Sequence, residues 1–587
     1  MVVMEKKLSS LLSAIECEAL SADGKTPLDL NVIGITPVTD IVFDSRNVFP
    51  GSLFFALPGH HTDGNKYIAE AIGKGANVIV YQGEIEHDER LKIAKTIIKR
   101  GLDKIEDKNS VFPVFLKVED AQAAMAPVAD AFYDSPSKKL IVIGVTGTEG
   151  KSSTVSFVWQ LLRLAGKKAG FISTVQYSLG ADALANPEHT TTPEAPIVQK
   201  YLYDMVQNGC EYAVVESSSH GLSKKLNRLG NVCFDCGIFM NVTLEHLEFH
   251  KTYEQYRDDK ANLFRALDEN DHIKTVDNIE RNIQPFGIVN FEDPASLYFS
   301  DCTKQKIIGF TTEGMAGKAA AETGKNAVAL PKIPDEIPCM KAKNIAAARF
   351  GISFTIDAPD CSTLKAVNAD PALPREHKSI HITATLPGAF NAYNIMASII
   401  AVSGLTGKSF EELAGLISEL KPITGRMTTI DMNQDFEVII DYAHTPSSFE
   451  TIFPPIRKRC AGRIFALFGS GGERDLTKRP LQGEIAGKFC DVVVLTDEDP
   501  RGEDSVQLLE DIAKGCRKAG KKDDIDLFII PDRPSAIRKT FSMAQKGDIV
   551  LLLGKGHENS IIYKDYVMPY DEIAEAKKAL QEMQHIH

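Results

Sequence analysis

Runs of hydrophobic residues alternate along the chain with segments in which hydrophobic positions recur every three or four residues. The run over residues 139–145 predicts a strand, and the glycine-rich turn after it leads into a predicted helix over 153–165. That helix has one apolar face, which consists of Val155, Val158, Leu162 and Ala165. Gly166 follows as a stop signal. Strands that alternate with helices in this way predict an α/β fold.

The last third of the chain contains four runs of the type found in buried strands: "FEVIIDYAHTP", "RIFALFGSGG", "DVVVLTDEDP" and "DIVLLLGKGHE". Each run ends in polar or glycine-rich residues. An open parallel sheet places its ligand-binding groups at the carboxyl ends of its strands. These four ends are therefore candidate parts of a binding site.

Other segments predict less regular structure. "YAVVES" and "CGIFMNV" predict two more strands. The first twenty residues predict an ordinary N-terminal helix rather than a signal peptide, because their apolar run is short and is broken by Ser and Glu. Residues 312–345 are rich in Gly, Ala, Lys and Pro, and this composition predicts an insertion or a mobile loop.

Length and composition limit the classes of function. At 587 residues the chain is too long for one hydrophobic core, which predicts about three or four domains. A net charge of −13 argues against a broad nucleic-acid or membrane surface, and no apolar stretch reaches the about 20 residues of a membrane span. Ten scattered cysteines indicate reduced thiols and a cytoplasmic protein. Cys233 and Cys236 are expected to be buried rather than to bind a metal.

The stretch "GVTGTEGKSSTV", residues 144–155, has the strand, glycine-rich turn and helix that a phosphate-binding loop requires. In such a loop, backbone N–H groups and the helix N-terminus face the anion. Lys151 can reach the β- and γ-phosphates, and Ser152 can ligate Mg²⁺. Val145 stands where the usual motif has its first glycine, but the glycines at 144, 147 and 150 still free the backbone. We therefore expect nucleotide binding here.

Three further candidates each have two interpretations. Glu216 ends a strand and can complete a Mg²⁺ shell, although the serines at 217–219 are also typical of a helix cap. His246 and His250 are four residues apart, which suits either a metal site or packing on a helix. Lys260 lies among charged residues in "YRDDKANLF", which is also typical of a solvated helix face.

Further motifs accompany the phosphate loop in a fixed order: "TTTPEAP", "ESSSHGL", "NVTLEHLEFH", "LPGAFNAYN", "DYAHTP", "GSGGERDLTKRP", "DEDPR" and "GKGHE". In sequence and order they resemble the Mur ligase family, and within it the branch of tripeptide synthetases. The resemblance covers nearly the whole chain, from "FDSR" to "GKGHE". "DYAHTP", "ERDLTKRP" and "GKGHE" are specific to that branch rather than to ATPases at large.

The resemblance implies three α/β domains. They are a domain for the UDP-linked substrate over 1–137, a central P-loop-type ATPase with a mostly parallel sheet over 138–422, and a C-terminal Rossmann-like domain for the amino acid over 423–587.

The resemblance also implies an ATP-dependent, ADP-forming ligase of peptidoglycan precursor synthesis. ATP phosphorylates the terminal carboxylate of UDP-MurNAc-L-Ala-D-Glu, and the α-amine of a diamino acid attacks the acyl phosphate. The implied cofactors are ATP, two Mg²⁺ ions and a carbamylated Lys260, which offers an anionic oxygen where an ammonium would repel the metal. The expected partners are these small molecules only, and the expected state is a monomer.

The resemblance carries four groups of site residues to this chain. For ATP they are Gly147, Thr148, Glu149, Gly150, Lys151, Ser152, Ser153, Asn391, Arg426 and Asp441. The catalytic residues are Lys151, Glu216, His246 and Lys260, and the metal ligands are Ser152, Glu216, His246 and the modified Lys260. For the UDP-linked substrate they are Phe43, Ser45, His60, His61, Thr62, Thr191, Thr192, Ser218 and Arg228. For the diamino acid they are Arg474, Glu498, Asp499, Pro500, Arg501, Gly554 and Glu558.

Two positions depart from the family pattern. The family's diaminopimelate signature is usually Asp-Asn-Pro-Arg, whereas this chain has Glu498-Asp499-Pro500-Arg501. Arg501 favours a side chain that ends in a carboxylate, but the acid at Asp499 can instead accept the ammonium of lysine or ornithine. We favour meso-diaminopimelate, with lysine and ornithine as alternatives. Glu149 replaces the usual Asn of the phosphate loop and adds a negative charge close to phosphate.

Two other functions remain open at this point. Folylpolyglutamate synthetases and the other Mur ligases share the ATPase, but their substrates do not need the carboxylate clamp of "DEDPR" and "GKGHE". The second alternative is a nucleotide-binding scaffold or switch that has lost catalysis, and the altered phosphate loop is its support.

Overall fold

The computed structural model describes residues 4–59, 62–102, 113–187, 190–243, 245, 247–313, 330–359 and 379–584. The chain folds into two compact units. The first comprises Met1–Gly144, Lys168–Asp235 and Arg265–Ile283, and the second comprises Val145–Lys167, Cys236–Phe264 and Gln284–His587. Both units contain sheets and helices, which confirms the predicted α/β class. The domain boundaries at 137/138 and 422/423 stay a prediction.

The amino-terminal part of the first unit is built on a sheet with the order β2-β7-β6-β5-β4. Its strands are β2 (Glu18–Leu20), β4 (Asp40–Val42), β5 (Ser52–Ala56), β6 (Val78–Tyr81) and β7 (Val114–Lys117). β4 to β7 run parallel, and β2 pairs antiparallel with β7. A separate antiparallel pair joins β1 (Lys6–Lys7) to β3 (Pro37–Val38).

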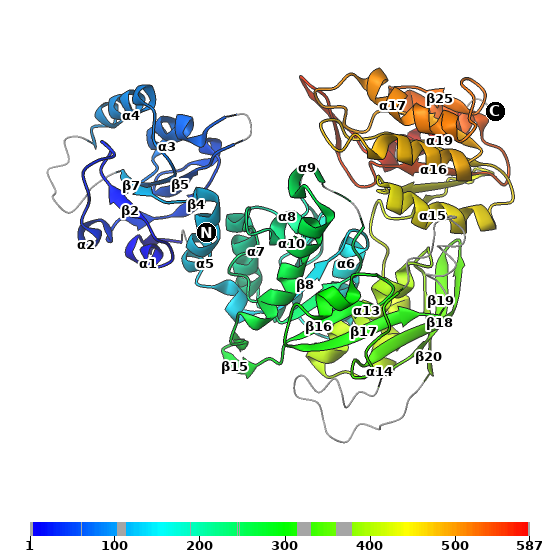
Figure 1. Cartoon of the computed structure of the whole chain (residues 1–587), viewed down its shortest axis with the longest axis horizontal. Helices are drawn as coiled ribbons and strands as arrows, with labels where there is room; N and C mark the ends of the chain where they lie inside the picture. The colour runs from blue at the N-terminus through cyan, green and yellow to red at the C-terminus, as the bar shows by residue number, and fades with distance from the viewer. Residues whose placement is uncertain are drawn as a thin grey trace. The chain divides into compact units, whose positions relative to one another are not determined.

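Helices cover both faces of this sheet, because successive strand residues point to opposite sides. They are α1 (Ser9–Leu12), α2 (Leu30–Ile33), α3 (Ile68–Lys74), α4 (His87–Lys99) and α5 (Ala121–Phe132). Phe55 belongs to a core that includes residues of α1 and α5, whereas its neighbour Phe54 belongs to a core that includes residues of α3 and α4. Figure 1 shows α3 and α4 on one side of the sheet and α1 and α5 on the other.

The remainder of the first unit contains strands in the order β11-β10-β9-β12-β8 and a separate hairpin. The strands are β8 (Ile141–Thr146), β9 (Ala169–Ile172), β10 (Gln176–Ser178), β11 (Leu184–Ala185) and β12 (Tyr212–Glu216), with the hairpin β14 (Ile273–Val276) and β15 (Ile279–Asn282). The helices are α7 (Ala195–Gln207) and α8 (Ser219–Leu222). Strand β8 continues past Gly144 into the second unit.

A buried ammonium group ties together three segments of the first unit. Lys274 Nζ donates hydrogen bonds to the carbonyls of Ser137 (2.9 Å) and Cys233 (2.7 Å). It also pairs with Asp235 Oδ2 at 2.9 Å, and the other oxygen of Asp235 lies 3.0 Å from His272 Nδ1. The side chain of Lys274 is 1% exposed. Every proton of this ammonium therefore has an acceptor in place of water.

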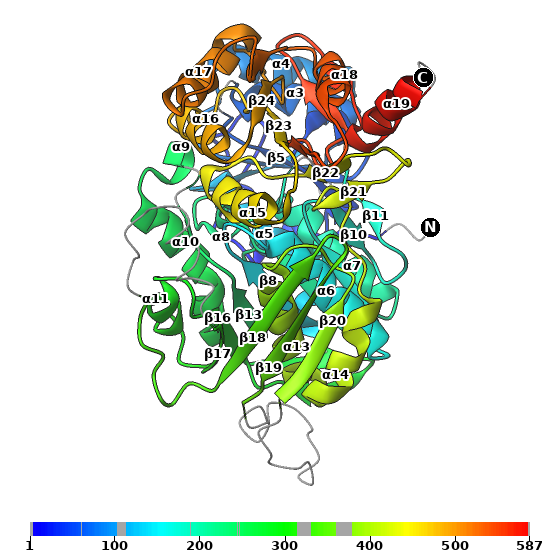
Figure 2. The same ribbon diagram turned by 90° about the vertical axis from the view of Figure 1, so that its right-hand side faces the viewer.

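The second unit contains a sheet with the order β13-β16-β17-β18-β19-β20. Its strands are β13 (Cys236–Phe239), β16 (Phe286–Asn290), β17 (Lys306–Thr312), β18 (Cys339–Ala348), β19 (Gly351–Asp357) and β20 (Ser379–Ala384). β13 to β18 are parallel, and β18 to β20 are antiparallel. Figure 2 shows β18, β19 and β20 side by side.

The helices of this part of the second unit include the one that follows the phosphate loop. They are α6 (Lys151–Leu164), α9 (Leu247–His250), α10 (Tyr253–Arg265), α11 (Ser296–Ser300), α13 (Asn391–Thr406) and α14 (Phe410–Leu416). α6 packs against α13, whose side chains from Asn394 to Leu405 are all buried. The predicted helix over 153–165 is confirmed, with a start two residues earlier.

A second sheet of this unit, called here the C-terminal sheet, has the order β21-β22-β26-β23-β24-β25. Its strands are β21 (Thr428–Ile430), β22 (Glu437–Asp441), β23 (Ile464–Phe468), β24 (Val492–Leu495), β25 (Leu527–Ile529) and β26 (Ile549–Leu553). All neighbours are parallel except β21 with β22. A small hairpin joins β27 (Ser560–Ile562) to β28 (Val567–Pro569).

Helices cover both faces of the C-terminal sheet. They are α15 (Pro446–Arg459), α16 (Lys478–Phe489), α17 (Ser505–Lys518), α18 (Arg533–Met543) and α19 (Glu572–Gln584). One core combines residues of α15, α16 and α17 with strand residues such as Leu551, and the other combines α18 and α19 with residues such as Leu552. β22, β23, β24 and β26 confirm the four strands predicted in the last third of the chain.

Two predictions of local structure are wrong in part. Within the predicted N-terminal helix only Ser9–Leu12 are helical, and β2 begins at Glu18. Of the predicted loop over 312–345, residues from Cys339 onward form part of β18, because they pair with β17 and β19. Residues 314–329 lie outside the described residues.

Cys233 and Cys236 are buried, as predicted. Among the helices within the described residues, none is long and apolar enough to cross a membrane.

We predict that Lys274→Ala destabilises the protein, because it leaves Asp235 buried without its cation. The expected loss is about 3 kcal/mol, the scale for breaking a buried ion pair. It is measured as the shift in urea midpoint, with the exposed Lys99→Ala as the matched control. A Lys274→Ala protein as stable as that control would contradict the role of this network.

Candidate active site

The phosphate loop lies between β8 and α6, where the sequence predicts it. Gly150 is the N-cap of α6 and has a φ of +82°. A side chain there would be strained, and its Cβ would also lie 2.9 Å from Asn394 Oδ1. Lys151 Nζ donates to the carbonyl oxygen of Thr148 at 2.7 Å. The side chain of Lys151 thus folds back over the loop, and the loop leads into the N-terminus of α6. A helix N-terminus is a site that favours an anion.

Asn241 braces the loop from the segment that follows β13. Its side-chain oxygen accepts hydrogen bonds from the N–H groups of Thr148 (3.1 Å) and Glu149 (2.8 Å). Its own carbonyl accepts a further bond from Thr148 N at 2.9 Å. Asn241 is not among the residues predicted from the sequence. Its only signal there is a polar residue soon after the buried run "CGIFM".

Lys260 is buried, so the alternative of a solvated helix face is wrong for this residue. Its Nζ donates to the carbonyl of Gly147 at 2.7 Å and lies 4.5 Å from the centre of the Tyr256 ring. The Tyr256 hydroxyl is 3.1 Å from Thr148 Oγ1. Burial raises the pKa of Tyr256 well above its ordinary value, so this side chain remains a neutral phenol. Helix α10 therefore supports the loop through two side chains.

Arg426 approaches the same loop from the segment before β21. Its Nη2 donates to Ser152 Oγ at 3.4 Å. Asp441, at the end of β22, accepts hydrogen bonds from Met427 N (2.7 Å) and Ala443 N (2.8 Å), and it thereby positions the residue next to Arg426. Burial raises the pKa of Asp441, and the guanidinium of Arg426 opposes that shift.

Two cavities adjoin these residues. The smaller is lined by residues that include Ser153, Phe157, Pro387, Phe390, Asn391, Ile423 and Arg426. The larger has a volume of about 340 Å³ and a mainly apolar lining that includes Pro387, Phe390, Met427, Ile439 and Ile452. Asn391 therefore lies with Arg426 at one cavity, as expected for two residues of one ligand site, and its Nδ2 donates to Pro387 O at 2.7 Å.

Glu216 lies in the first unit at the end of β12 and is 1% exposed. Its carboxylate accepts hydrogen bonds from Ser173 Oγ (2.5 Å), Thr174 N (2.9 Å) and Thr174 Oγ1 (3.0 Å). The helix cap proposed for the following serines is confirmed, because Ser218 Oγ accepts from Gly221 N as the N-cap of α8.

Four predicted substrate residues come together next to this turn. Thr192 Oγ1 donates to the carbonyl of Glu216 at 2.8 Å and is 2.9 Å from Ser218 Oγ. Arg228 Nη1 donates to the carbonyl of Thr192 at 3.0 Å, and its guanidinium also pairs with Glu194. Thr191 is the partly exposed neighbour of Thr192. One hydroxyl, that of Thr192, thus links two of the predicted segments.

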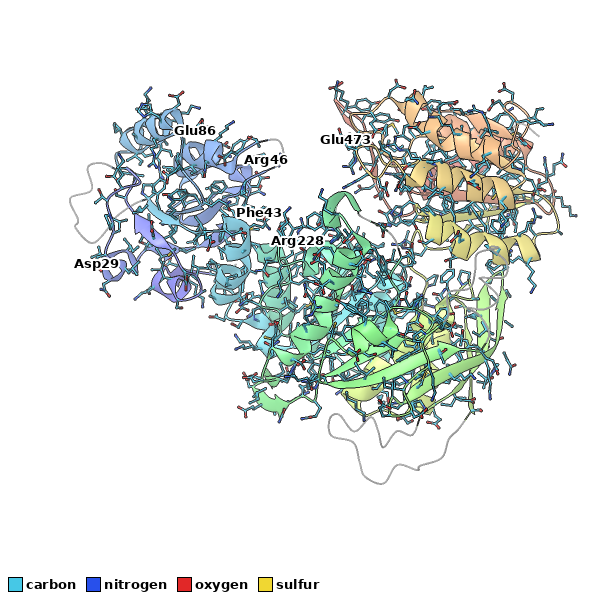
Figure 3. The ribbon with its side chains drawn as sticks, viewed as in Figure 1. Asp29, Phe43, Arg46, Glu86, Arg228 and Glu473 are labelled. Atoms are coloured by element: carbon cyan, nitrogen blue, oxygen red, sulfur yellow. The ribbon has the colours of Figure 1, made fainter. Side chains whose placement is uncertain are left out.

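The residues predicted to bind uridine are in the amino-terminal part of the first unit. Phe43 is partly buried, Thr62 is exposed, and Ser45 is buried with its hydroxyl 3.1 Å from Glu70 Oε2. Figure 3 labels Phe43 and Arg228, which come from different parts of this unit. Three predicted site residues lie outside the described residues, namely His60, His61 and His246. Their roles stay predictions.

The end of β24 and the end of β26 meet at a buried carboxylate. Gly554 has a φ of +95°, and a Cβ there would lie 2.5 Å from Glu498 Oε2. That oxygen has no hydrogen-bond partner among the described residues. Burial raises the pKa of Glu498 to about 7, even though the Lys478 and Lys555 ammonium groups oppose the shift. Glu498 can therefore exchange a proton near neutral pH.

Lys555 links the two predicted amino-acid-binding segments. Its Nζ pairs with Asp499 Oδ1 at 2.9 Å and with Glu558 Oε2 at 2.5 Å, and its side chain is 1% exposed. Asp499 Oδ1 also accepts from Ile562 N at 2.9 Å, and Glu558 Oε1 accepts from the Tyr442 hydroxyl at 3.2 Å. The motif "GKGHE" contains this lysine, but no role for it was predicted from the sequence.

The two predicted arginines of this pocket differ in exposure. Arg501 is partly buried, has a φ of +54°, and has an Nε atom without a partner in the described part of the chain. Its backbone N–H donates to Ile562 O at 2.9 Å, which anchors the segment after Pro500. Arg474 is exposed on the loop after β23, next to Glu473, which Figure 3 labels. Both arginines lie in segments that follow the carboxyl ends of strands in the C-terminal sheet.

Three parts of the chain match known protein families. Residues 37–133 match "Mur ligase family, catalytic domain", residues 145–402 match "Mur ligase middle domain", and residues 425–556 match "Mur ligase, glutamate ligase domain". A UDP-N-acetylmuramyl-tripeptide synthetase of Treponema denticola is 50% identical over 92% of this chain and 90% of its own length. The chain belongs to the Mur ligase family.

Two further comparisons agree with this result: a second relative in sequence agrees with the family, and a solved structure agrees with the fold. A UDP-N-acetylmuramoyl-L-alanyl-D-glutamate–2,6-diaminopimelate ligase of Geobacillus kaustophilus is 34% identical over 94% of this chain and 96% of its own length. A solved structure titled with that same activity aligns with a TM-score of 0.55 at 22% identity, over 99% of this chain and all of that one. As a Mur ligase, the protein is an ATP-dependent ligase of peptidoglycan synthesis that adds amino acids to UDP-MurNAc peptides.

We predict that Glu498→Gln stabilises this Mur ligase at alkaline pH. The pKa of Glu498 in the folded protein, about 7, lies above its ordinary value of 4.5, so folding favours the protonated form. The stabilisation is therefore complete below about pH 4.5 and is lost as the pH rises through 7.

At pH 8 the expected gain in unfolding free energy is about 3 kcal/mol, and it shrinks toward pH 4. Urea unfolding across this pH range measures it, with the exposed Asp565→Asn as control. A gain that does not change with pH would contradict the assignment.

Proposed function

We propose that this ligase joins a diamino acid, meso-diaminopimelate by preference, to UDP-MurNAc-L-Ala-D-Glu. The observation that carries the proposal is the group of charges at the carboxyl ends of β24 and β26. Glu498, Asp499 and Glu558 supply carboxylates there, and Arg501 supplies a guanidinium in the same segment. An acceptor that carries two ammonium and two carboxylate groups finds opposite charges for both in such a pocket.

The proposed ATP site uses the phosphate loop over 147–153 together with Asn391, Arg426 and Asp441. Backbone N–H groups at the start of α6 offer donors to phosphate oxygens, and Lys151 and Arg426 supply positive charge. The contact between the Arg426 guanidinium and Ser152 Oγ supports this grouping. Asn391 and Arg426 line the same small cavity, which supports placing both residues in one site.

The proposed reaction has two steps. A carboxylate oxygen of D-Glu attacks the γ-phosphorus of ATP, so that an acyl phosphate forms and ADP leaves. The neutral α-amine of the acceptor then attacks the acyl carbon, phosphate leaves with the electrons of the C–O bond, and the nitrogen loses a proton as the amide forms. Lys151 and Arg426 stabilise the charge on the transferring phosphoryl group.

The residues proposed to hold Mg²⁺ offer the ligands that this ion prefers. Ser152 has a hydroxyl, and Glu216 has a carboxylate that is already oriented by Ser173 and Thr174. When bound, Mg²⁺ neutralises phosphate charge. Lys260 fits only in carbamylated form, because its ammonium would repel the ion. His246 is the remaining proposed ligand.

The choice of acceptor rests on how Asp499 is paired. Its carboxylate already accepts from Lys555 Nζ and Ile562 N, so part of its negative charge is compensated within the chain, by an ammonium that it shares with Glu558. Arg501 then remains the group that distinguishes acceptors, and a guanidinium suits the second carboxylate of diaminopimelate. Lysine and ornithine are the second candidates, because Glu498 and Glu558 give the pocket further negative charge.

We expect the purified protein, given ATP, Mg²⁺ and UDP-MurNAc-L-Ala-D-Glu, to form the diaminopimelate tripeptide faster than the lysine or ornithine product. Product masses and rates for the three acceptors measure this. Arg501→Lys keeps the charge but loses the planar fork, so we expect the preference for diaminopimelate to fall about tenfold. A preference for lysine or ornithine would overturn the acceptor assignment, and ATP splitting with no new amide would overturn the function.

We expect Lys260→Ala to abolish ligation and short carboxylates such as formate or acetate to restore part of it. The physical reason is that such an anion can supply the oxygen that the carbamate is proposed to contribute. Lys260→Arg keeps a cation and is the control, for which we expect no rescue. Full activity of Lys260→Ala, or equal rescue of both variants, would contradict the carbamate role.

A further inference from the structure

Glu149 is the one acid of the phosphate loop, and its side chain reaches the N-terminal end of helix α15. Glu149 Oε1 accepts a hydrogen bond from Thr445 Oγ1 at 3.0 Å. Thr445 is the N-cap of α15, and its Oγ1 also accepts from Ser448 N at 3.1 Å. A hydroxyl can accept through a lone pair and donate its proton at the same time. The cap of α15 and the contact to the loop are therefore compatible.

The segment after β13 makes two further contacts with the same end of α15. Thr243 Oγ1 donates to Ser447 Oγ at 3.2 Å. Glu245 Oε1 lies 3.7 Å from His444 Nε2. Burial lowers the pKa of His444 to about 4, so this imidazole is neutral at pH 7 and offers no full charge to either acid. Two carboxylates, those of Glu149 and Glu245, thus face one helix N-terminus, whose partial positive charge favours them.

Ionisation of Glu149 costs free energy, because its carboxyl group is buried and lies near a second acid. Burial and the neighbouring Glu245 carboxylate raise the pKa of Glu149, whereas Lys151, Arg426 and the Thr445 hydroxyl act in the other direction. A nucleotide phosphate in the loop would add more negative charge close to this carboxylate, whose own backbone N–H is part of the loop. With phosphate bound, the hydrogen bond from Thr445 and the N-terminal end of α15 would therefore stabilise the Glu149 carboxylate more than they do without phosphate.

We propose that Glu149 makes the affinity of the phosphate loop for nucleotide depend on its contact with the N-terminal end of α15. With the contact formed, the hydroxyl of Thr445 and the helix N-terminus offset the carboxylate, and the loop accepts phosphate. With the contact broken, the uncompensated carboxylate repels it. Because such coupling is reciprocal, nucleotide stabilises the contact to the same extent. The inference rests on the proposed nucleotide site and adds a positioning role for Glu149 and Thr445.

The test is a double-mutant cycle on the full chain, read out as the dissociation constant of ADP with Mg²⁺ by titration calorimetry. Thr445→Val keeps the shape of the side chain and removes the donor, so it should weaken ADP binding about tenfold, the scale of a hydrogen bond to a charged group. In a Glu149→Gln background the same change should cost less than about threefold, because the amide carries no charge. Thr445→Ser keeps the hydroxyl and should bind ADP as the wild type does.

Two controls separate this coupling from simple damage to the helix. Loss of the cap alone would weaken binding equally in both backgrounds. Thr243→Val breaks the contact to Ser447 and leaves the hydroxyl of Thr445 in place. It should weaken ADP binding by the same factor with Glu149 and with Gln at that position. Equal factors for Thr445→Val in the two backgrounds would overturn the inference and leave the nucleotide site intact. A wild-type protein that binds no ADP would overturn both.

Discussion

The phosphate loop and the acidic segments of the second unit are each held by the buried side chain of a lysine. The ammonium of Lys260 donates to Gly147 in the phosphate loop, and the ammonium of Lys555 lies between Asp499 and Glu558. A buried ammonium costs several kcal/mol unless hydrogen-bond acceptors surround it. Each lysine therefore fixes the position of the groups that satisfy it. These contacts hold the loop and the acidic segments in place in the unmodified chain, and in the proposed carbamylated form of Lys260 the remaining N–H can still donate to Gly147.

The cost of burying charge also bears on Gly554 and on the carboxylate of Glu498. Gly554 leaves room for the Glu498 carboxylate, whose Oε2 has no partner among the described residues and whose pKa lies near 7. Proteins pair buried acids when the acid is only structural, since an unpaired one is costly. The unpaired Oε2 of Glu498, with Lys478 and Lys555 as the neighbouring cations, is thus consistent with the amino-acid-binding role proposed for this residue.

The sequence was informative where a residue's role is local. The strands β22, β23, β24 and β26 were predictable because strands buried on both faces are continuous apolar runs. β18 was missed because its outer residues are exposed and carry no such run. In the site, Lys151 and the cap at Ser218 follow from short motifs, whereas the contacts of Asn241 and Lys555 join residues 93 and 56 positions apart. No periodicity within one segment can reveal such partners.

Two acids, Glu149 and Asp499, stand in this chain where the family usually has an amide, and both have a donor at the carboxylate. The two donors differ in kind. Lys555 brings a full positive charge to Asp499, although it shares that charge with Glu558. Thr445 brings only a dipole to Glu149, so a negative charge on this carboxylate is offset less and is more sensitive to an anion in the loop. The first substitution therefore concerns the pocket alone, whereas the second is the basis of the proposed coupling between nucleotide and α15.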